Sequence, residues 1–152
     1  MARFVYSMQS VLNIKQQTEN QTKMEFAVAQ SELNEQLDIL DDYINRKARY
    51  LQEAEDLRNE DTLKLQDILD NQYATAQMDV MIKHQAGVVQ QYEQKLERVR
   101  VKLARNMQER KMQETLRDRA FAEFLEEQKQ EEYKENDQRS SFTYAKKQKD
   151  DD

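Results

Sequence analysis

The sequence has almost none of the residues that β-rich folds use to turn the chain. Its 152 residues include no proline and a single glycine, Gly87. Because turns draw on Gly, Pro, Asn and Asp, this composition argues against a β-sandwich, a β-barrel and a βαβ fold. It also excludes a glycine-rich loop for nucleotide phosphates, since such a loop needs several glycines.

Cysteine, tryptophan and long apolar runs are missing as well. Without cysteine the chain has no disulfide, no cysteine-ligated metal centre and no thiol catalysis. The mean hydropathy is −1.12, and no apolar run approaches the ~18 residues that a transmembrane helix needs. The first 12 residues also lack the apolar region of a secretory signal. We therefore expect neither a membrane span nor a signal peptide.

What the sequence does contain is typical of long helices. Charged residues make up 36% and hydrophobic residues 38% of the chain, and good helix formers such as Ala, Glu, Lys, Leu, Arg and Gln dominate. Seven Tyr and five Phe, together with a clear apolar period, argue against a disordered chain. The composition therefore predicts an elongated, all-α, coiled-coil protein.

Two runs of residues at heptad spacing indicate two coiled-coil helices. The first run steps alternately by four and three residues, and it comprises Leu33, Leu37, Leu40, Ile44, Lys47, Leu51 and Ala54. The second run steps by three and four residues, and it comprises Ile82, Gln85, Val89, Tyr92, Leu96, Val99 and Leu103. Its period then drifts through Met107 to Leu116, which indicates a stutter in the supercoil.

The best turn and capping residues lie between these two runs, at residues 59–62 and 69–72. We therefore expect a first long helix over 1–58, a hairpin tip region over 59–78 and a second long helix over 79–138. The helices would join near residue 70 and form an antiparallel two-helix coiled-coil hairpin. Residues 139–152 are polar and are expected to form a frayed tail.

The distribution of charge favours one register for this hairpin. Residues 32–42 hold acidic but no basic side chains, and residues 98–111 are mainly basic. A register in which paired residue numbers add up to 140 places these blocks side by side, and it forms the seam layers Leu37–Leu103, Ile44–Leu96 and Leu51–Val89. A parallel dimer would stack each block on its own copy, so we expect a monomer in isolation.

Catalysis and nucleic-acid binding are both poorly supported. His84 is the only histidine, and a general base needs an orienting partner and a pocket. Neighbouring carboxylates such as Glu126 and Glu127 do not face each other on a helix, so a solvated acidic face is expected rather than a metal site. The basic stretch 98–111 is a possible nucleic-acid patch, but neutralisation by the acidic block of the other helix is the favoured interpretation. We expect no enzyme activity, no cofactor and no nucleic-acid partner.

A second row of residues lies beside the expected seam. On the first helix it comprises Gln36, Leu40, Tyr43 and Lys47, and on the second helix it comprises Ala74, Met78, Met81 and Gln85. One interpretation is a thick seam that the Tyr rings cover. The alternative is an exposed apolar and aromatic face that docks a partner.

Both ends of the chain carry short patterns of aromatic, apolar and charged residues. The N-terminal end has Phe4, Tyr6, Met8, Gln9, Val11 and Leu12 at the spacing of an F-x-Y-x-L-Q-x-V-L pattern, with Lys15 shortly after. Towards the C-terminal end, Glu114 and Leu116 are followed by the aromatic Phe121 and Phe124, and then by Glu132, Lys134 and Asp137. These two patterns resemble the ends of the flagellar FliJ family, which usually has Leu at the position of Met8 and Glu at the position of Gln138.

The resemblance implies a component of the flagellar type III protein export apparatus. Family members are stalk-like antiparallel coiled coils that bind and stimulate the hexameric export ATPase FliI with the terminal end of the hairpin. They also contact the export gate protein FlhA and escort the export chaperones. Such a protein would be cytoplasmic and would reach the inner face of the cell membrane through its partners only.

The resemblance also assigns residues to these contacts. The ATPase end would comprise Phe4, Tyr6, Val11, Leu12, Lys15, Phe121, Phe124 and Asp137. The gate face would comprise Gln36, Leu40, Tyr43, Met78 and Met81. Two rival functions are a structural coiled-coil spacer, which needs no exposed aromatic row, and a prefoldin-like holdase, which needs an apolar hairpin tip.

Overall fold

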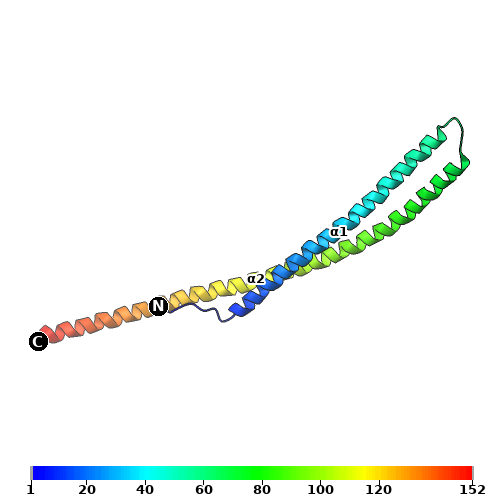
Figure 1. The fold of residues 1–152 in the computed structure, drawn as a ribbon. Coiled ribbons are helices and arrows are strands. Elements are labelled where there is room, and N and C mark those ends of the chain that lie inside the picture. Colours follow the sequence, from blue (N-terminus) through cyan, green and yellow to red (C-terminus); the bar gives the residue numbers. More distant parts are fainter. Residues whose placement is uncertain (1, 152) are drawn as a thin grey trace. The chain divides into compact units, whose positions relative to one another are not determined.

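The computed structural model describes residues 2–151, which form two long helices (Figure 1). Helix α1 spans Gln9–Arg58 and helix α2 spans Leu65–Asp151. No strand occurs in the described part of the chain. The prediction of an all-α helical hairpin is therefore confirmed. None of the helices in residues 2–151 has an apolar stretch long enough to cross a membrane.

The connection between the helices is short and lies at residues 59–64. The backbone N–H of Asn59 donates to the carbonyl oxygens of Glu55 and Asp56, at 3.2 Å each, and closes the last turn of α1. Arg58 in this last turn and Asp67 in the first turn of α2 both suit the helix dipoles. The helices thus join before residue 65, and the expected junction near residue 70 is wrong.

The second expected turn segment, 69–72, lies inside α2. Its Asn71 is buried, and the side-chain amide donates a 2.9 Å hydrogen bond to the carbonyl oxygen of Tyr50 on α1. Asn is frequent in turns because its side chain bonds to nearby backbone. Here the side chain of Asn71 bonds across the hairpin instead, so the residue that suggested a turn makes an interhelical contact.

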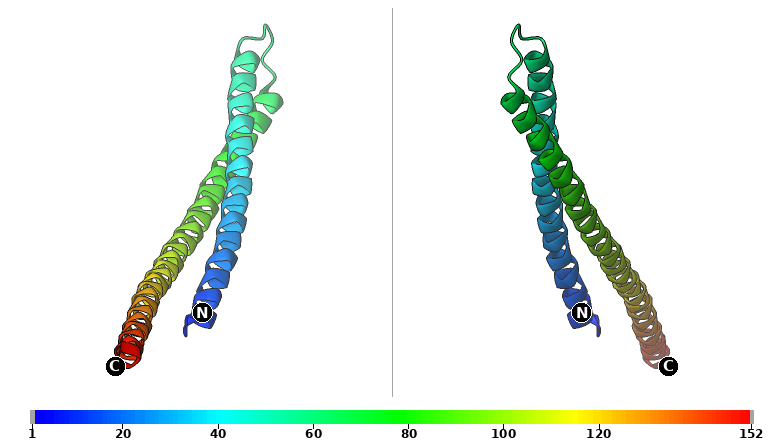
Figure 2. Two further views of the ribbon diagram at one scale, coloured as in Figure 1. Left: turned by 90° about the vertical axis from the view of Figure 1, so that its left-hand side faces the viewer. Right: turned by 90° about the vertical axis from the view of Figure 1, so that its right-hand side faces the viewer.

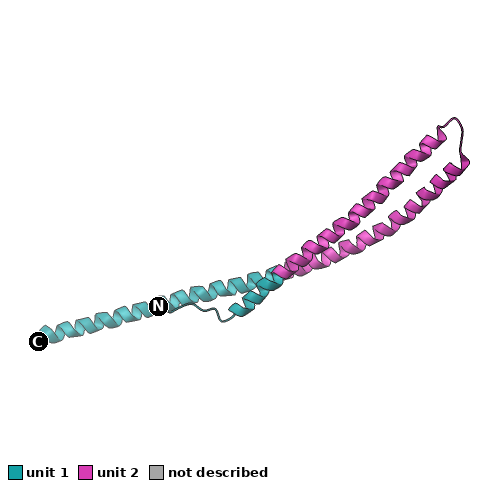
Figure 3. Ribbon diagram, in the orientation of Figure 1, with its two compact units in different colours: residues 1–19, 106–152 teal, residues 20–105 magenta. Residues whose placement is uncertain are grey.

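The structure divides into two compact units (Figure 3). Unit 1 comprises residues 1–19 and 106–152, and unit 2 comprises residues 20–105. Unit 2 holds the hairpin connection and the paired parts of both helices on either side of it. Figure 2 shows α1 and α2 crossing close to the connection in both side views, as two helices do when they wind around each other.

Burial identifies the seam of unit 2. On α1 the seam is the row of buried and half-buried residues at heptad spacing, and they comprise Thr22, Phe26, Ala29, Leu33, Gln36, Leu40, Tyr43, Lys47, Tyr50, Ala54 and Leu57. On α2 they comprise Ile68, Asn71, Thr75, Met78, Ile82, Gln85, Val89, Tyr92, Leu96, Val99 and Leu103. The predicted run from Ile82 to Leu103 is therefore confirmed in full.

On α1 the predicted seam is only half right. Leu33, Leu40 and Ala54 lie in the seam, but Leu37, Ile44 and Leu51 are 40%, 48% and 51% exposed. The seam takes the residue immediately before each of them. The heptad period fits both choices, and sequence reasoning selected the more apolar one. The seam instead takes Gln36, which hydrogen-bonds to Gln85, and Tyr50, whose carbonyl oxygen accepts a hydrogen bond from Asn71.

The register also differs from the expected one. Cross-helix pairs in unit 2 join Gln36 with Gln85, Tyr50 with Asn71, Lys47 with Asp79, Glu32 with Lys95, and Glu25 with Lys102. Their residue numbers add up to between 121 and 127, not to 140. The layers Leu37–Leu103, Ile44–Leu96 and Leu51–Val89 are therefore wrong. A connection at 59–64 forces this shift, because the register of an antiparallel pair follows from the position of its turn.

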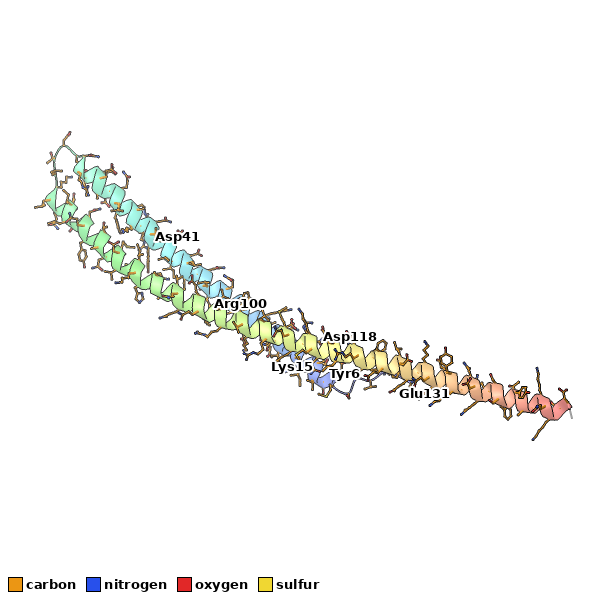
Figure 4. The ribbon with its side chains drawn as sticks, turned by 180° about the vertical axis from the view of Figure 1, so that it is seen from behind. Tyr6, Lys15, Asp41, Arg100, Asp118 and Glu131 are labelled. Carbon is orange, nitrogen blue, oxygen red and sulfur yellow. The ribbon has the colours of Figure 1, made fainter. Side chains whose placement is uncertain are left out.

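This register leaves the acidic and basic blocks apart. Figure 4 shows Asp41 on α1 and Arg100 on α2 at different levels of unit 2. Arg100 pairs with Glu97 on its own helix instead, at 2.5 Å. Within the acidic block, Glu32 pairs with Lys95 and Asp42 with Arg46. The expected neutralisation of residues 32–42 by residues 98–111 therefore does not occur.

Candidate partner-binding surfaces

In unit 1 the N-terminal segment packs on the middle of α2 in an aromatic cluster. Residues 2–8 precede α1 without forming helix, and the ring of Phe4 packs on α2. Its centroid lies 5.1 Å from that of Phe121, edge to face at 66°, and 5.4 Å from that of Phe124. The expected approach of Phe4 to these two rings is confirmed. Phe121 is still 44% exposed, so the cluster presents an aromatic surface.

Two residues of the N-terminal pattern anchor this segment to α2. Tyr6 is 9% exposed, and its hydroxyl donates to Oε1 of Gln113 at 3.2 Å. Leu12 is 1% exposed and Val11 is half-buried. These apolar side chains are therefore largely committed to packing inside unit 1. The surface that they leave for a partner comes from Phe4, Phe121 and their neighbours.

Ion pairs continue the contact between α1 and α2 in unit 1. Lys15 Nζ lies 2.9 Å from Glu109 Oε2, and Figure 4 shows Lys15 and Tyr6 together at this end of α1. Arg110 bonds to Glu19, whose side chain is 4% exposed, and to Glu114 at 2.9 Å. The bonds to Glu114 and Glu19 raise the pKa of the Arg110 guanidinium above its ordinary value. Lys15, expected at the rim of a binding surface, thus has a partner on α2.

These polar residues also explain the apparent stutter in the sequence. Beyond Leu103 the inward positions of α2 continue at heptad spacing through Asn106, Arg110 and Gln113. All three are polar, while the apolar Leu116 lies outside the row and is 46% exposed. The period is therefore regular, and the expected stutter is wrong. An apolar pattern cannot reveal a seam whose layers are held by hydrogen bonds and ion pairs.

The last part of α2 has no partner helix within unit 1. Every described residue from 129 to 151 is exposed, including Asp137 and also Glu131, which Figure 4 labels. Asp137 thus lies on α2 well beyond the aromatic cluster. Sequence reasoning assigned no role to the aromatic side chains of this segment, although aromatics in so polar a stretch were a signal. They are Tyr133, Phe142 and Tyr144, which are 62%, 72% and 67% exposed.

The residues assigned to the gate face lie in the seam of unit 2 or next to it. Gln36, Leu40 and Tyr43 are half-buried seam positions, Met78 is 4% exposed, and Met81 is half-buried beside the seam. The expectation that this row lies beside the seam of α1 is therefore wrong. A two-helix seam is open along both edges, so Tyr43 and Met81 keep part of their surface accessible.

The environment of His84 does not resemble a catalytic site. His84 is exposed and borders a shallow depression on one side of α2, lined by Val80, Lys83, His84, Gly87, Val88 and Gln91. No carboxylate borders this depression to orient the imidazole ring. Among residues 2–151 no cluster of three His, Cys, Asp or Glu side chains is arranged to hold a metal ion.

Comparison with known protein families gives a match over most of the chain. The family model described as flagellar FliJ protein matches residues 4–149, which is nearly the whole chain. No curated protein and no solved structure matches it. The match covers both the aromatic cluster of unit 1 and the hairpin of unit 2.

Proposed function

Because the chain belongs to the flagellar FliJ family, a family of flagellar export apparatus components, we propose that it is the non-enzymatic stalk of that apparatus. Its terminal surface in unit 1 binds the hexameric export ATPase and stimulates hydrolysis. A face of unit 2 contacts the export gate, and the protein escorts export chaperones. It works in the cytoplasm and reaches the membrane through these partners.

The observation that carries this proposal is the incomplete burial of the aromatic cluster. The ring of Phe4 packs on those of Phe121 and Phe124, yet Phe121 stays 44% exposed and Val5, next to Phe4, stays 76% exposed. Clustered apolar surface of this kind is typical of an interaction site. Aromatic anchors surrounded by polar residues supply most of the binding energy in many interfaces. The exposed part of α2 beyond residue 128 extends the surface available to the ATPase.

The test is stimulation of the purified export ATPase by Phe121→Ala. We expect stimulation to need roughly tenfold more protein than with the wild-type chain, because a central aromatic anchor is lost. Tyr73→Ala is the matched control, since Tyr73 is a 69% exposed aromatic residue of unit 2. Equal stimulation by Phe121→Ala and the control, with unchanged helicity, would move the ATPase site elsewhere.

The gate contact is tested separately on unit 2. Tyr43→Ala combined with Met81→Ala shortens one half-buried side chain of this face on each helix. We expect binding to the purified gate protein to weaken by about 2 kcal/mol. Met78→Ala is the contrasting variant, because Met78 is 4% exposed and should lower stability more than binding per folded molecule. The reverse pattern would show that the row serves only to pack the seam.

A further inference from the structure

One edge of the unit 2 hairpin carries a row of exposed apolar side chains. The ion pairs Glu32–Lys95 and Glu25–Lys102 join the flanking positions along one edge of the helix pair. Helix geometry places Leu37, Ile44 and Leu51 along the opposite edge, seven residues apart on α1. We call this opposite edge, with the residues of α2 that share it, the apolar edge.

Helix α2 contributes apolar residues to the same edge near the connection, and further along it contributes Asp79, which pairs with Lys47 of the seam. Leu65 and Leu69 fall on the side of α2 that faces away from the two ion pairs, and they are 70% and 48% exposed. The apolar edge therefore comprises Leu37, Ile44, Leu51, Leu65 and Leu69. A helix with apolar residues on two faces is typical of a bundle, where each face packs on a different neighbour. Unit 2 supplies a neighbour for only one of the two faces of α1.

The charges around the apolar edge indicate what its missing neighbour carries. Residues 35–91 hold 12 Asp and Glu against six Lys and Arg, an excess of six negative charges. Asp38 and Asp41 are exposed next to Leu37 and Ile44. Because the register separates the acidic block from the basic stretch 98–105, the negative charge stays uncompensated in this part of unit 2. Such a field attracts a positively charged partner.

We propose that the apolar edge docks a basic amphipathic helix of a partner protein, which completes a three-helix packing with α1 and α2. Leucines of the partner would lie against Leu37, Ile44 and Leu51, and its Lys and Arg would face Asp38 and Asp41. This surface is separate from the aromatic cluster of unit 1. It is also separate from the gate face, whose residues lie in the seam or, for Met81, on the edge of the ion pairs. The proposal therefore stands independently of the ATPase and gate contacts.

The experiment measures binding of a labelled synthetic helical peptide to the full-length protein by fluorescence anisotropy. The peptide has leucines at heptad spacing and lysines on both sides of them, and a matched peptide has glutamate in place of every lysine. We expect the basic peptide to bind and the acidic peptide to bind at least tenfold more weakly. Equal binding of the two peptides would indicate an unselective apolar surface, as a holdase has, and would overturn the proposal.

Protein variants locate the peptide on the surface. Leu37→Gln with Ile44→Gln should weaken binding of the basic peptide at least tenfold, and it leaves the seam intact because both side chains are exposed. Val101→Gln is the matched control, since Val101 is 47% exposed on another side of unit 2, and it should bind like the wild type. Asp38→Asn with Asp41→Asn should weaken binding and reduce its dependence on salt.

Two further outcomes would overturn the proposal. The first is no binding of the basic peptide, or undiminished binding by the Leu37→Gln, Ile44→Gln variant. The second is a concentration-dependent dimer, detected by sedimentation equilibrium, that this variant abolishes. In that case the occupant of the apolar edge is a second copy of this chain, and its basic stretch 98–105 supplies the charge.

Discussion

Two rows of residues on α1 lie one position apart, and only one of them lies in the seam of unit 2. One row, Gln36, Tyr43 and Tyr50, contains no aliphatic residue and lies in the seam of unit 2. The other row, Leu37, Ile44 and Leu51, is wholly aliphatic and is 40% to 51% exposed. Hydrophobicity alone would choose the second row for the seam. The comparison shows that the partner helix, and not α1 alone, decides which side of α1 is buried.

The polar members of the seam have specific partners on α2. The side-chain amide of Gln85 donates to Oε1 of Gln36 at 2.8 Å and to the Gln36 carbonyl oxygen at 3.0 Å. Asn71 likewise bonds to the carbonyl oxygen of Tyr50. A buried polar side chain is costly unless it is hydrogen-bonded, so each pair fits only one register. Polar layers of this kind set the register and orientation of coiled coils at some cost in stability.

The largest expected difference is between shortening a side chain in the seam of α1 and shortening one in the exposed row. Leu33→Ala removes a seam residue that is 6% exposed, and it should lower the free energy of unfolding by about 2–3 kcal/mol because it leaves a cavity. Ile44→Ala removes a residue that is 48% exposed and should change it by about 0.5 kcal/mol or less. Urea unfolding followed by circular dichroism measures both.

A large loss of stability in Ile44→Ala would restore the seam expected from the sequence. Equal losses in the two variants would show that α1 is packed on both sides in solution. Equal losses would also count against the apolar edge as a free docking surface, because an exposed edge contributes little stability to the isolated chain.

The sequence was sufficient to predict the fold class and the approach of Phe4 to Phe121 and Phe124. The absence of Gly and Pro, the heptad spacing from Ile82 to Leu103 and the turn residues at 59–62 all indicated a helical hairpin. The approach of Phe4 to Phe121 and Phe124 followed from that hairpin. These features survive an error in register, because they depend on periodicity and on the order of the elements.

The register could not be derived in the same way. Two turn signals competed, and the one containing Asn71 proved to be a cross-helix hydrogen bond. The charge blocks then supported the wrong junction, since opposite charges need not be adjacent when each finds a partner nearby, as Arg100 does with Glu97. The seam positions Asn106, Arg110 and Gln113 are all polar, so a search for apolar residues at heptad spacing does not find them. Pairwise hydrogen bonding is a property of two segments together, and a single helix does not reveal it.

A second prediction tests whether the glutamine layer sets the register. Gln85→Ala removes two hydrogen bonds from a residue that is 6% exposed, and it should cost about 1 kcal/mol of unfolding free energy. Gln36→Leu with Gln85→Leu should be as stable as the wild type but less uniquely paired. Sedimentation velocity should then detect dimers or a broader distribution of species. If the Gln36→Leu, Gln85→Leu variant is a monodisperse monomer with an unchanged melting curve, other layers of the seam set the register.

A third prediction concerns the only glycine. Gly87 lies inside α2 with no positive φ, and a Cβ placed on it would meet no atom within 4 Å. Gly87→Ala should therefore raise the free energy of unfolding by about 0.5–1 kcal/mol, because alanine favours the helix and introduces no clash. Gln91→Ala, one turn further along the same depression, is the control for helix propensity alone. If Gly87→Ala instead lowered the free energy of unfolding, the protein in solution would have a close contact at this position that is absent from the structure.

The smallest effects come from ion pairs, which separate contacts between the helices from contacts within one helix. The hydrogen bond to Glu32 is the main cause that raises the pKa of Lys95 above its ordinary 10.5, and the bond from Arg100 is the main cause that lowers the pKa of Glu97 below its ordinary 4.5. A raised lysine pKa stabilises the fold below its unfolded value and loses that contribution as the pH rises through the folded value. A lowered glutamate pKa stabilises the fold above its unfolded value and loses that contribution as the pH falls. All four side chains lie at the surface, so each contribution is small and screened by salt.

Lys95→Met should flatten the decline of the urea midpoint at alkaline pH, and Glu97→Gln should flatten its decline at acid pH. Midpoint curves that stay parallel to the wild-type curve over both ranges would mean that neither pair persists in solution, and the edge that Glu32 and Lys95 define would then rest on the hydrogen-bonded seam alone.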